Sequence, residues 1–238
     1  MKVKKLEIIT NNLLFALVLS LASFEIGIYI NRKTKLAILN PLLIGIIITI
    51  TFLIVFKIDY KTYDNGGKFI NMFLGPSTVV LAVPLYKQLE LLKRNAKAII
   101  VGIFCGTVIG IISIICISHL VGLDDTIIRS LAPKSVTTPI GISISEQLGG
   151  LVPITVLAIV GTGIIGAVIG PTVCKLCKIK DEVAVGVAIG TASHAVGTSK
   201  ALELGEVQGA MSSLSIGIAG IMTVVLAPLI LNLLNGIF

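Results

Sequence analysis

The chain has 238 residues, of which 55% are hydrophobic and only 13% are charged, and its mean hydropathy is +1.04. Soluble domains carry about 25% charged residues, so this composition favours an integral membrane protein. The net charge of +7 does not indicate nucleic-acid binding, because the Lys and Arg residues fall in short loops between apolar runs. We therefore expect the lipid bilayer, and no nucleic acid, as the surroundings of this chain.

Five apolar runs have the length of a membrane span, about 20 residues. They cover residues 13–30, 36–56, 98–118, 151–173 and 210–234. Basic residues precede the first run, as in a signal peptide, but the run is long and no small-residue cleavage pattern follows it. We therefore interpret the first run as a retained span.

Three further segments are interrupted by prolines, or by glycines and polar residues. Residues 69–88 contain Pro76 and Pro84, and residues 128–148 contain Pro133 and Pro139. Two prolines exclude a continuous straight helix, because each removes a backbone donor and clashes with the preceding turn. The third, residues 183–203, changes at position 190 from an apolar run to glycines and hydroxyl residues. Such backbone occurs at membrane depth only where it is buried in protein or lines a wet cavity.

These patterns predict an all-α polytopic membrane protein with about five full spans and three interrupted or re-entrant helical segments. The first two interrupted segments share the pattern Leu-x-Pro-x-(Ser/Thr)-Val, beginning at Leu74 and Leu131, and glycine pairs recur in the spans that follow them. We interpret residues 69–118 and 128–173 as two repeats. Chance similarity within apolar sequence is the alternative.

Charge suggests that the two units are inverted relative to each other. The loop predicted after the first interrupted segment holds Lys87, Lys93, Arg94 and Lys97, whereas residues 146–150 after the second hold no base. The positive-inside rule places the first loop in the cytoplasm and the second outside. Paired interrupted segments in inverted repeats are typical of secondary transporters whose binding site lies near the membrane midplane.

A small organic anion would need a cation or oriented donors for its carboxylate and hydroxyls for its other oxygens. Lys134 is the most costly residue to bury, and an ionisable group within the membrane indicates a functional site. We interpret Lys134 as the counter-charge; snorkelling to an interface is the alternative. The predicted substrate-binding residues are Ser77, Thr78, Lys134, Ser135, Thr137, Thr138, Ser193, His194, Thr198 and Ser199.

Two of these groups have competing interpretations. His194 titrates near physiological pH and could carry a coupling proton, but a lone histidine is more often a packed hydrogen-bonding residue. Ser193, Thr198 and Ser199 could contact substrate or could bond neighbouring membrane helices. Lys87 and Lys200 each precede a glutamate by three residues, a spacing that predicts helix-end ion pairs.

No catalytic, metal or cofactor site is expected. Cys174 and Cys177 have C-x-x-C spacing, but no second pair or histidine cluster completes a metal site, so we interpret them as ordinary helix-end residues. His194 and Ser193 have no plausible aspartate partner, and no phosphate loop or nucleophile elbow is present. The sequence therefore argues against an enzyme.

Three stretches resemble the LrgB/CidB family of antiholin-like bacterial membrane proteins. They are residues 74–87, 132–141 and 190–199, and the resemblance extends over nearly the whole chain after the first span. It implies one integral membrane domain over residues 1–238, with N-terminal spans in 1–68 and an interrupted segment and last span in 183–234.

The resemblance also implies a multi-pass protein of the bacterial cell membrane with two candidate functions. Bacterial members are described as acting with a small holin-like (LrgA/CidA-type) membrane protein on murein hydrolase activity and lysis. Plastid relatives resemble glycolate/glycerate carriers, and some bacterial pairs are linked to pyruvate movement. We therefore predict a proton-coupled carrier of a small monocarboxylate that acts with this partner; the alternative is a regulator of lysis without transport. A homodimer is compatible with a carrier of this size.

Overall fold

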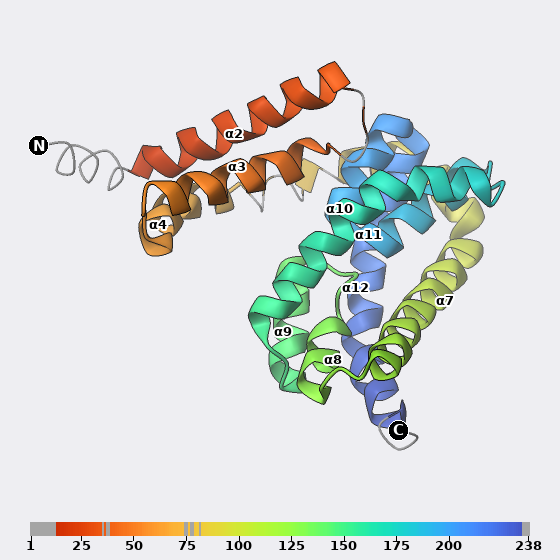
Figure 1. The fold of residues 1–238 in the computed structure, drawn as a ribbon. Coiled ribbons are helices and arrows are strands. Elements are labelled where there is room, and N and C mark those ends of the chain that lie inside the picture. The colour runs from red at the N-terminus through yellow and green to blue at the C-terminus, as the bar shows by residue number, and fades with distance from the viewer. Residues whose placement is uncertain are drawn as a thin grey trace, which may run out of the picture. The chain divides into compact units, whose positions relative to one another are not determined.

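A computed structural model describes residues 13–34, 36, 39–73, 76, 79–80 and 82–234 (Figure 1). Every regular element in these residues is a helix, and the chain forms two compact units, Met1–Val80 and Leu81–Phe238. Four helices are long and apolar enough to cross a membrane, and a shorter apolar helix accompanies them. The predicted all-α polytopic architecture is confirmed.

The first unit contains α2 (Leu13–Thr34), α3 (Pro41–Val55) and α4 (Tyr60–Asn71). Helix α2 packs against both α3 and α4, and the Ser20 and Tyr63 hydroxyls, 2.8 Å apart, join α2 to α4. Helix α3 begins at a proline after Asn40, whose side chain accepts a hydrogen bond from the Leu42 N–H. The predicted span 36–56 is therefore too long, because the helix begins only after this cap.

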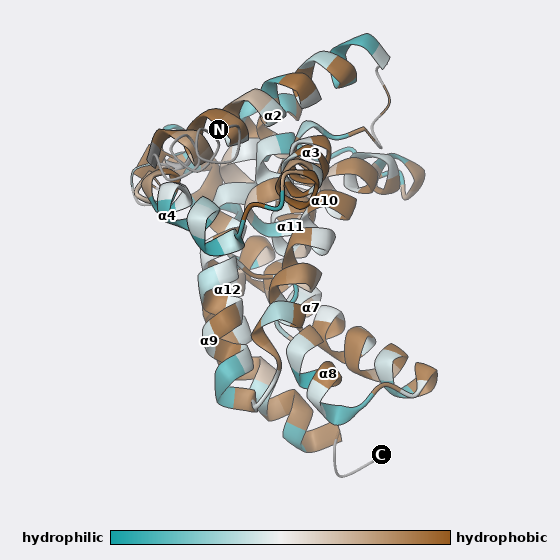
Figure 2. Ribbon diagram, turned by 60° about the vertical axis from the view of Figure 1, so that its left-hand side comes forward, coloured by the Kyte–Doolittle hydropathy of each residue, from teal (hydrophilic) through white to brown (hydrophobic). Residues whose placement is uncertain are grey.

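The second unit contains α6 (Ala82–Lys87), α7 (Leu89–Val121), α8 (Asp125–Leu131), α9 (Thr138–Leu148), α10 (Val152–Leu176), α11 (Glu182–Leu204) and α12 (Glu206–Leu234). Helices α7, α10 and α12 confirm the spans predicted at 98–118, 151–173 and 210–234. Hydrophobic residues predominate along the helices, and hydrophilic ones gather at many of their ends (Figure 2). This distribution suits helix sides that face lipid.

The predicted basic loop after the first interrupted segment is wrong. Lys93, Arg94 and Lys97 lie inside α7, which runs without a break from Leu89. Residues 89–98 contain no proline or glycine and consist mostly of good helix formers, so the span continues through them.

One of the two predicted ion pairs is present. Lys200 pairs with Glu203 at 2.7 Å as predicted, whereas Lys87 pairs with Glu206 at 3.3 Å.

Two interrupted segments are broken where the sequence predicts. Helices α8 and α9 are separated by residues 132–137. Helix α11 has a kink at His194, where φ is 42° and ψ is −136°. Each half of α11 holds roughly ten residues and spans about 15 Å, half of the hydrocarbon core of a bilayer. In the first interrupted segment, α6 ends at Lys87, and the central motif with Ser77 and Thr78 lies outside the described residues.

Candidate functional site

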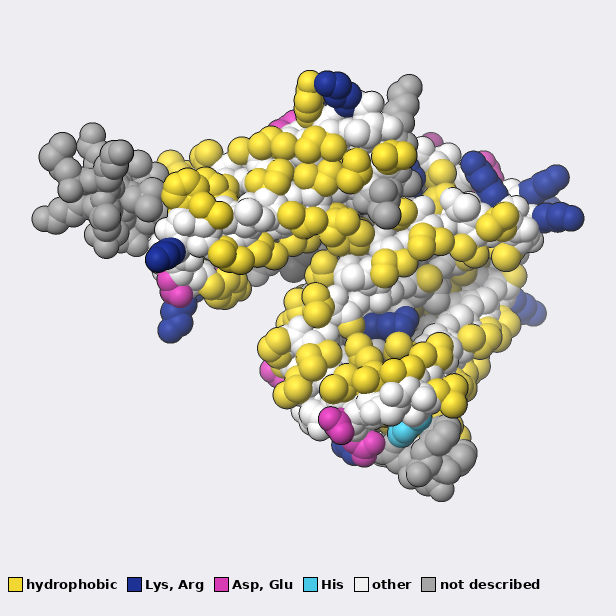
Figure 3. Space-filling view, viewed as in Figure 1, with side chains coloured by type: hydrophobic (Ala, Val, Ile, Leu, Met, Phe, Trp, Pro, Cys, Tyr) yellow, Lys and Arg dark blue, Asp and Glu magenta, His cyan; other side chains and the backbone are white. Residues whose placement is uncertain are grey.

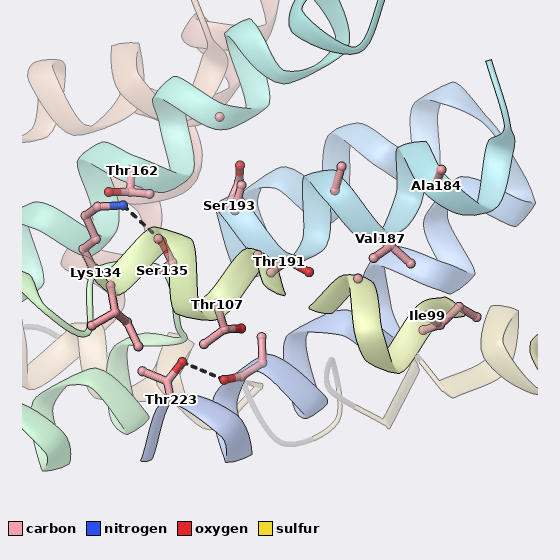
Figure 4. A pocket seen from close by; sticks show the side chains of 18 of the residues that line it. Ile99, Thr107, Lys134, Ser135, Thr162, Ala184, Val187, Thr191, Ser193 and Thr223 are labelled. Carbon is pink, nitrogen blue, oxygen red and sulfur yellow. Dashed lines mark hydrogen bonds between the residues drawn. The ribbon is translucent and has the colours of Figure 1, made fainter. Parts of the chain in front are cut away.

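A cavity of about 760 Å³ lies within the second unit. It is bounded by one face of α7, the break between α8 and α9, the middle of α10, the N-terminal half of α11 and part of α12 (Figure 4). The space-filling view shows a basic side chain in a hollow among hydrophobic ones (Figure 3). Small-molecule sites occupy roughly 300–1,000 Å³, so the cavity has the size of a binding site.

Small residues on α7 leave room for this cavity. Gly102, Gly106 and Gly110 recur every fourth position and therefore lie on one face of the helix, toward the cavity. A methyl group at Gly106 would approach the Thr191 methyl carbon to 3.1 Å, so α7 and α11 come close at this level. The cavity is thus lined mainly by apolar side chains and glycines, with several short hydroxyl side chains among them.

Lys134 supplies a positive charge to the cavity wall. Its Nζ donates a hydrogen bond to Ser135 Oγ at 3.2 Å, and Thr162 also lines the wall (Figure 4). In the described part of the chain, no carboxylate lies within ion-pair distance of Lys134. Asp181 is the other charged residue of the lining, and its carboxylate accepts a hydrogen bond from the Ala184 N–H at the start of α11. The lysine is therefore free to bind an anion.

A buried hydroxyl cluster fixes the break that carries Lys134. Ser130, Ser145 and Thr155, from α8, α9 and α10, are all fully buried. Thr155 Oγ1 lies 2.9 Å from the Ser130 carbonyl oxygen and 2.7 Å from Ser145 Oγ. Ser130 Oγ accepts a hydrogen bond from the Leu151 N–H at 2.6 Å. The cluster joins three helices around a stretch in which the backbone forms turn hydrogen bonds, from the Lys134 N–H to the Leu131 carbonyl and from the Val136 N–H to the Pro133 carbonyl.

The kink in α11 is stabilised by α10. The His194 ring nitrogen Nε2 lies 3.0 Å from the carbonyl oxygen of Ile159. Two glycines on α10 permit this approach: a methyl group at Gly163 would come within 2.8 Å of the imidazole, and one at Gly166 would overlap the Ser193 side chain. The kink therefore depends on α10 presenting no side chain at these two positions.

The structure brings together three of the predicted site residues, Lys134, Ser135 and Ser193, in the lining of the cavity. His194 and Thr198 are buried beside it, with Thr198 Oγ1 2.7 Å from Ser212 Oγ on α12. Thr137 and Thr138 lie partly buried at the start of α9, outside the lining, and Ser199 is exposed. Ser77 and Thr78 lie outside the described residues. Substrate binding by the ten residues stays a prediction.

Sequence reasoning missed three hydroxyls of the lining, Thr107, Thr162 and Thr223. Thr191 lies in the interrupted segment that we expected to line a cavity, although it was not among the predicted binding residues. Glycines at every fourth position of α7 were the available signal, because they mark a face that a cavity or a neighbouring helix uses.

Among the described residues no group of three or more His, Cys, Asp or Glu side chains could hold a metal ion. Cys174 is buried and Cys177 exposed, both as free thiols at the end of α10.

The apolar helices define a multi-pass membrane protein, and a broken segment and a kinked helix beside them line an internal cavity that contains a lysine and several hydroxyls. Residues 20–233 match the LrgB-like family. The chain is 34% identical over 223 residues to the antiholin-like protein LrgB of Bacillus subtilis (strain 168), covering 93% of this chain and 96% of that protein. It is 35% identical over 216 residues to the antiholin-like protein LrgB of Bacillus cereus (strain B4264), covering 90% and 94%. No solved structure matches the chain.

The chain therefore belongs to the LrgB-like family and is a multi-pass protein of the bacterial cell membrane. The resemblance inferred from the three sequence motifs is confirmed by matches that cover nearly the whole chain.

Proposed function

We propose that the chain is a carrier for a small monocarboxylate of the pyruvate, glycolate or lactate type. The observation that carries this proposal is Lys134, a half-buried ammonium group without a carboxylate partner in the described chain, in the wall of a cavity between apolar helices. Removing a charge from water is costly unless a counter-charge is supplied. An anion that enters the cavity supplies that counter-charge.

The surroundings of Lys134 suit one carboxylate rather than a larger anion. A single lysine offers three donors and one positive charge, and Ser135 and Thr162 add hydroxyls at the same wall. A phosphate or dicarboxylate would require further basic groups, whereas Lys134 is the lone basic residue among the described residues of the lining. A monoanion balances this charge one to one.

Broken helices at the cavity support transport rather than simple binding. The break between α8 and α9 presents Lys134, and Ser193 next to the kink of α11 also lines the cavity. Transporters place discontinuous helices at their substrate sites, where one bundle moves relative to another. The inverted-repeat relation between residues 69–118 and 128–173 remains part of this proposal.

Proton coupling and a protein partner complete the proposal. His194 is the buried titratable group beside the cavity, although its hydrogen bond to the Ile159 carbonyl also serves packing. The partner is a small holin-like membrane protein, and a homodimer is a second assembly to test. The competing function is control of murein hydrolase activity and lysis without transport, which the name of the relatives, antiholin-like protein LrgB, favours.

Uptake into proteoliposomes tests the carrier. We expect labelled pyruvate, lactate or glycolate to enter faster than into protein-free vesicles, with or without the holin-like partner, and faster still with an inward proton gradient. Lys134→Met should reduce uptake at least about tenfold, since charge-assisted hydrogen bonds contribute roughly 1.5–3 kcal/mol. The matched control is Lys200→Met, because Lys200 lies outside the lining and is paired with Glu203.

One result would contradict the carrier, and a second would contradict the role of Lys134 in it. Uptake equal to that of protein-free vesicles, with and without the partner, supports the regulatory function instead. Equal uptake by Lys134→Met and the wild type removes Lys134 from the site. If a proton moves with the anion, a protonophore should abolish the stimulation of uptake by the proton gradient.

A further inference from the structure

Two threonines of the cavity have hydroxyls without a hydrogen-bond partner among the described residues. Thr107 on α7 and Thr191 on α11 are each only 7% exposed. Neither Oγ1 atom has a partner within the described part of the chain. Burying a polar group without a partner costs free energy, and native proteins seldom leave such groups unpaired without a functional reason.

Other buried hydroxyls of α11 and α12 show the usual arrangement. Thr198, Ser215 and Thr223 each donate to the carbonyl four residues earlier, at 2.9, 2.8 and 2.7 Å. This bond is available to any Ser or Thr in a helix and satisfies its hydroxyl locally. Thr107 and Thr191 do not form it. The two side chains line the cavity, and their hydroxyls have no partner among the described residues.

The two threonines belong to one part of the cavity. The close approach between Gly106 and the Thr191 methyl group brings α7 and α11 together beside Thr107. Figure 4 shows both threonines around the same cavity as the hydrogen-bonded pair Lys134 and Ser135. The cavity thus has a cationic part at Lys134 and an uncharged hydroxyl part at the threonines.

We propose that Thr107 and Thr191 form a subsite for an uncharged oxygen of the substrate, a hydroxyl or keto group next to its carboxylate. This inference rests on the proposed function, in which Lys134 binds the carboxylate. A hydroxyl can donate to a keto oxygen and can accept from a substrate hydroxyl, so the pair suits both. A plain carboxylic acid leaves both threonines unpaired, and the site therefore discriminates against it.

Lactate and propionate test the subsite, because they share a three-carbon skeleton and differ by one hydroxyl. Binding is measured by titration calorimetry on the purified full-length chain in detergent, and flux in proteoliposomes. We expect the wild type to bind lactate at least about tenfold more tightly than propionate. Thr107→Val and Thr191→Val should each weaken lactate binding about tenfold and leave propionate binding unchanged, since each removes one hydrogen bond.

Control variants separate the subsite from folding and from the carrier proposal. Thr172→Val makes the same chemical change at an exposed position of α10 outside the lining and should affect neither acid. Circular dichroism checks that the Thr107 and Thr191 variants stay folded. Lys134→Met should weaken lactate and propionate equally, because it removes the shared carboxylate contact.

The outcomes distinguish the two proposals. Equal affinity of the wild type for lactate and propionate, or unchanged lactate binding in both threonine variants, overturns the subsite. If Lys134→Met nevertheless abolishes the binding of both acids, the carrier proposal stands without the subsite. A wild type that binds and transports neither acid overturns the carrier and the subsite together.

Discussion

The two broken segments beside the cavity differ in what breaks them. The break between α8 and α9 contains Pro133, which is fully buried, and ends just before Pro139 in the first turn of α9. Helix α11 contains no proline, yet its backbone leaves the helical region at His194. The first break is dictated by the local chain, because proline cannot continue a helix. The second is imposed by a neighbouring helix.

This difference indicates where each break is vulnerable. A positive φ at a non-glycine residue such as His194 costs free energy and persists only when the surrounding structure compensates for it. That compensation comes from α10, through the Ile159 carbonyl and through Gly163 and Gly166. Changes on α10 should therefore disturb the α11 kink more than changes within α11 itself. The prolines determine that the chain breaks between α8 and α9, and the hydroxyl cluster should hold the two helices in place around that break.

The largest effect is expected at Gly166. Gly166→Ala places a methyl group where the Ser193 side chain lies, so α11 must move. Overpacking of this kind costs about 1–3 kcal/mol, and we expect a loss of about 3 kcal/mol in the free energy of unfolding. The measurement is the unfolding of the chain in mixed detergent micelles, monitored by circular dichroism.

Gly161→Ala is the matched control on the same helix. A methyl group there meets nothing within 4 Å, so the higher helix propensity of alanine should leave stability unchanged or raise it by up to about 1 kcal/mol. Equal destabilisation by the two variants would show that the kink does not depend on the close contact between α10 and α11.

The next largest effect is expected at Thr155. Thr155→Val keeps the shape of the side chain but removes the hydroxyl that lies between Ser145 Oγ and the Ser130 carbonyl. Leaving buried hydrogen-bonding groups unpaired costs about 1–3 kcal/mol. We therefore expect the free energy of unfolding to fall by about 2 kcal/mol in the same measurement. Thr172→Val at an exposed position of α10 is the control, with less than about 0.5 kcal/mol expected. A loss no larger than that of the control would remove the cluster as the support of this break.

The smallest effect is expected within α11. Thr198→Val removes the contact between Thr198 Oγ1 and Ser212 Oγ, which joins α11 to α12. Interhelical hydrogen bonds in membrane proteins contribute about 0.6 kcal/mol on average, so we expect a loss of about 0.5–1 kcal/mol. Ser199→Ala, at the neighbouring exposed position, should stay within about 0.5 kcal/mol of the wild type. A loss at Thr198 larger than at Gly166 would reverse the comparison and locate the support of the kink in α11.

The sequence predicted the elements that depend on local chemistry. Apolar runs of sufficient length appear as α2, α7, α10 and α12, and Pro133 and Pro139 mark the break that the structure contains. Boundaries were less well predicted, because helix-forming residues such as Lys93 and Arg94 extended α7 through the expected loop. Of the predicted site residues, Lys134, Ser135 and Ser193 line the cavity.

By itself, the sequence determined that this is a helical membrane protein of the LrgB-like family, since hydropathy, prolines and motifs are properties of single segments. Only the tertiary structure decided that Thr107 and Thr191 share one cavity and have unpaired hydroxyls. It also decided that α11 breaks at His194 rather than at one of its glycines. The physical reason is that the rotation and approach of packed helices determine which side chain meets which, and residues far apart in the chain set that packing jointly.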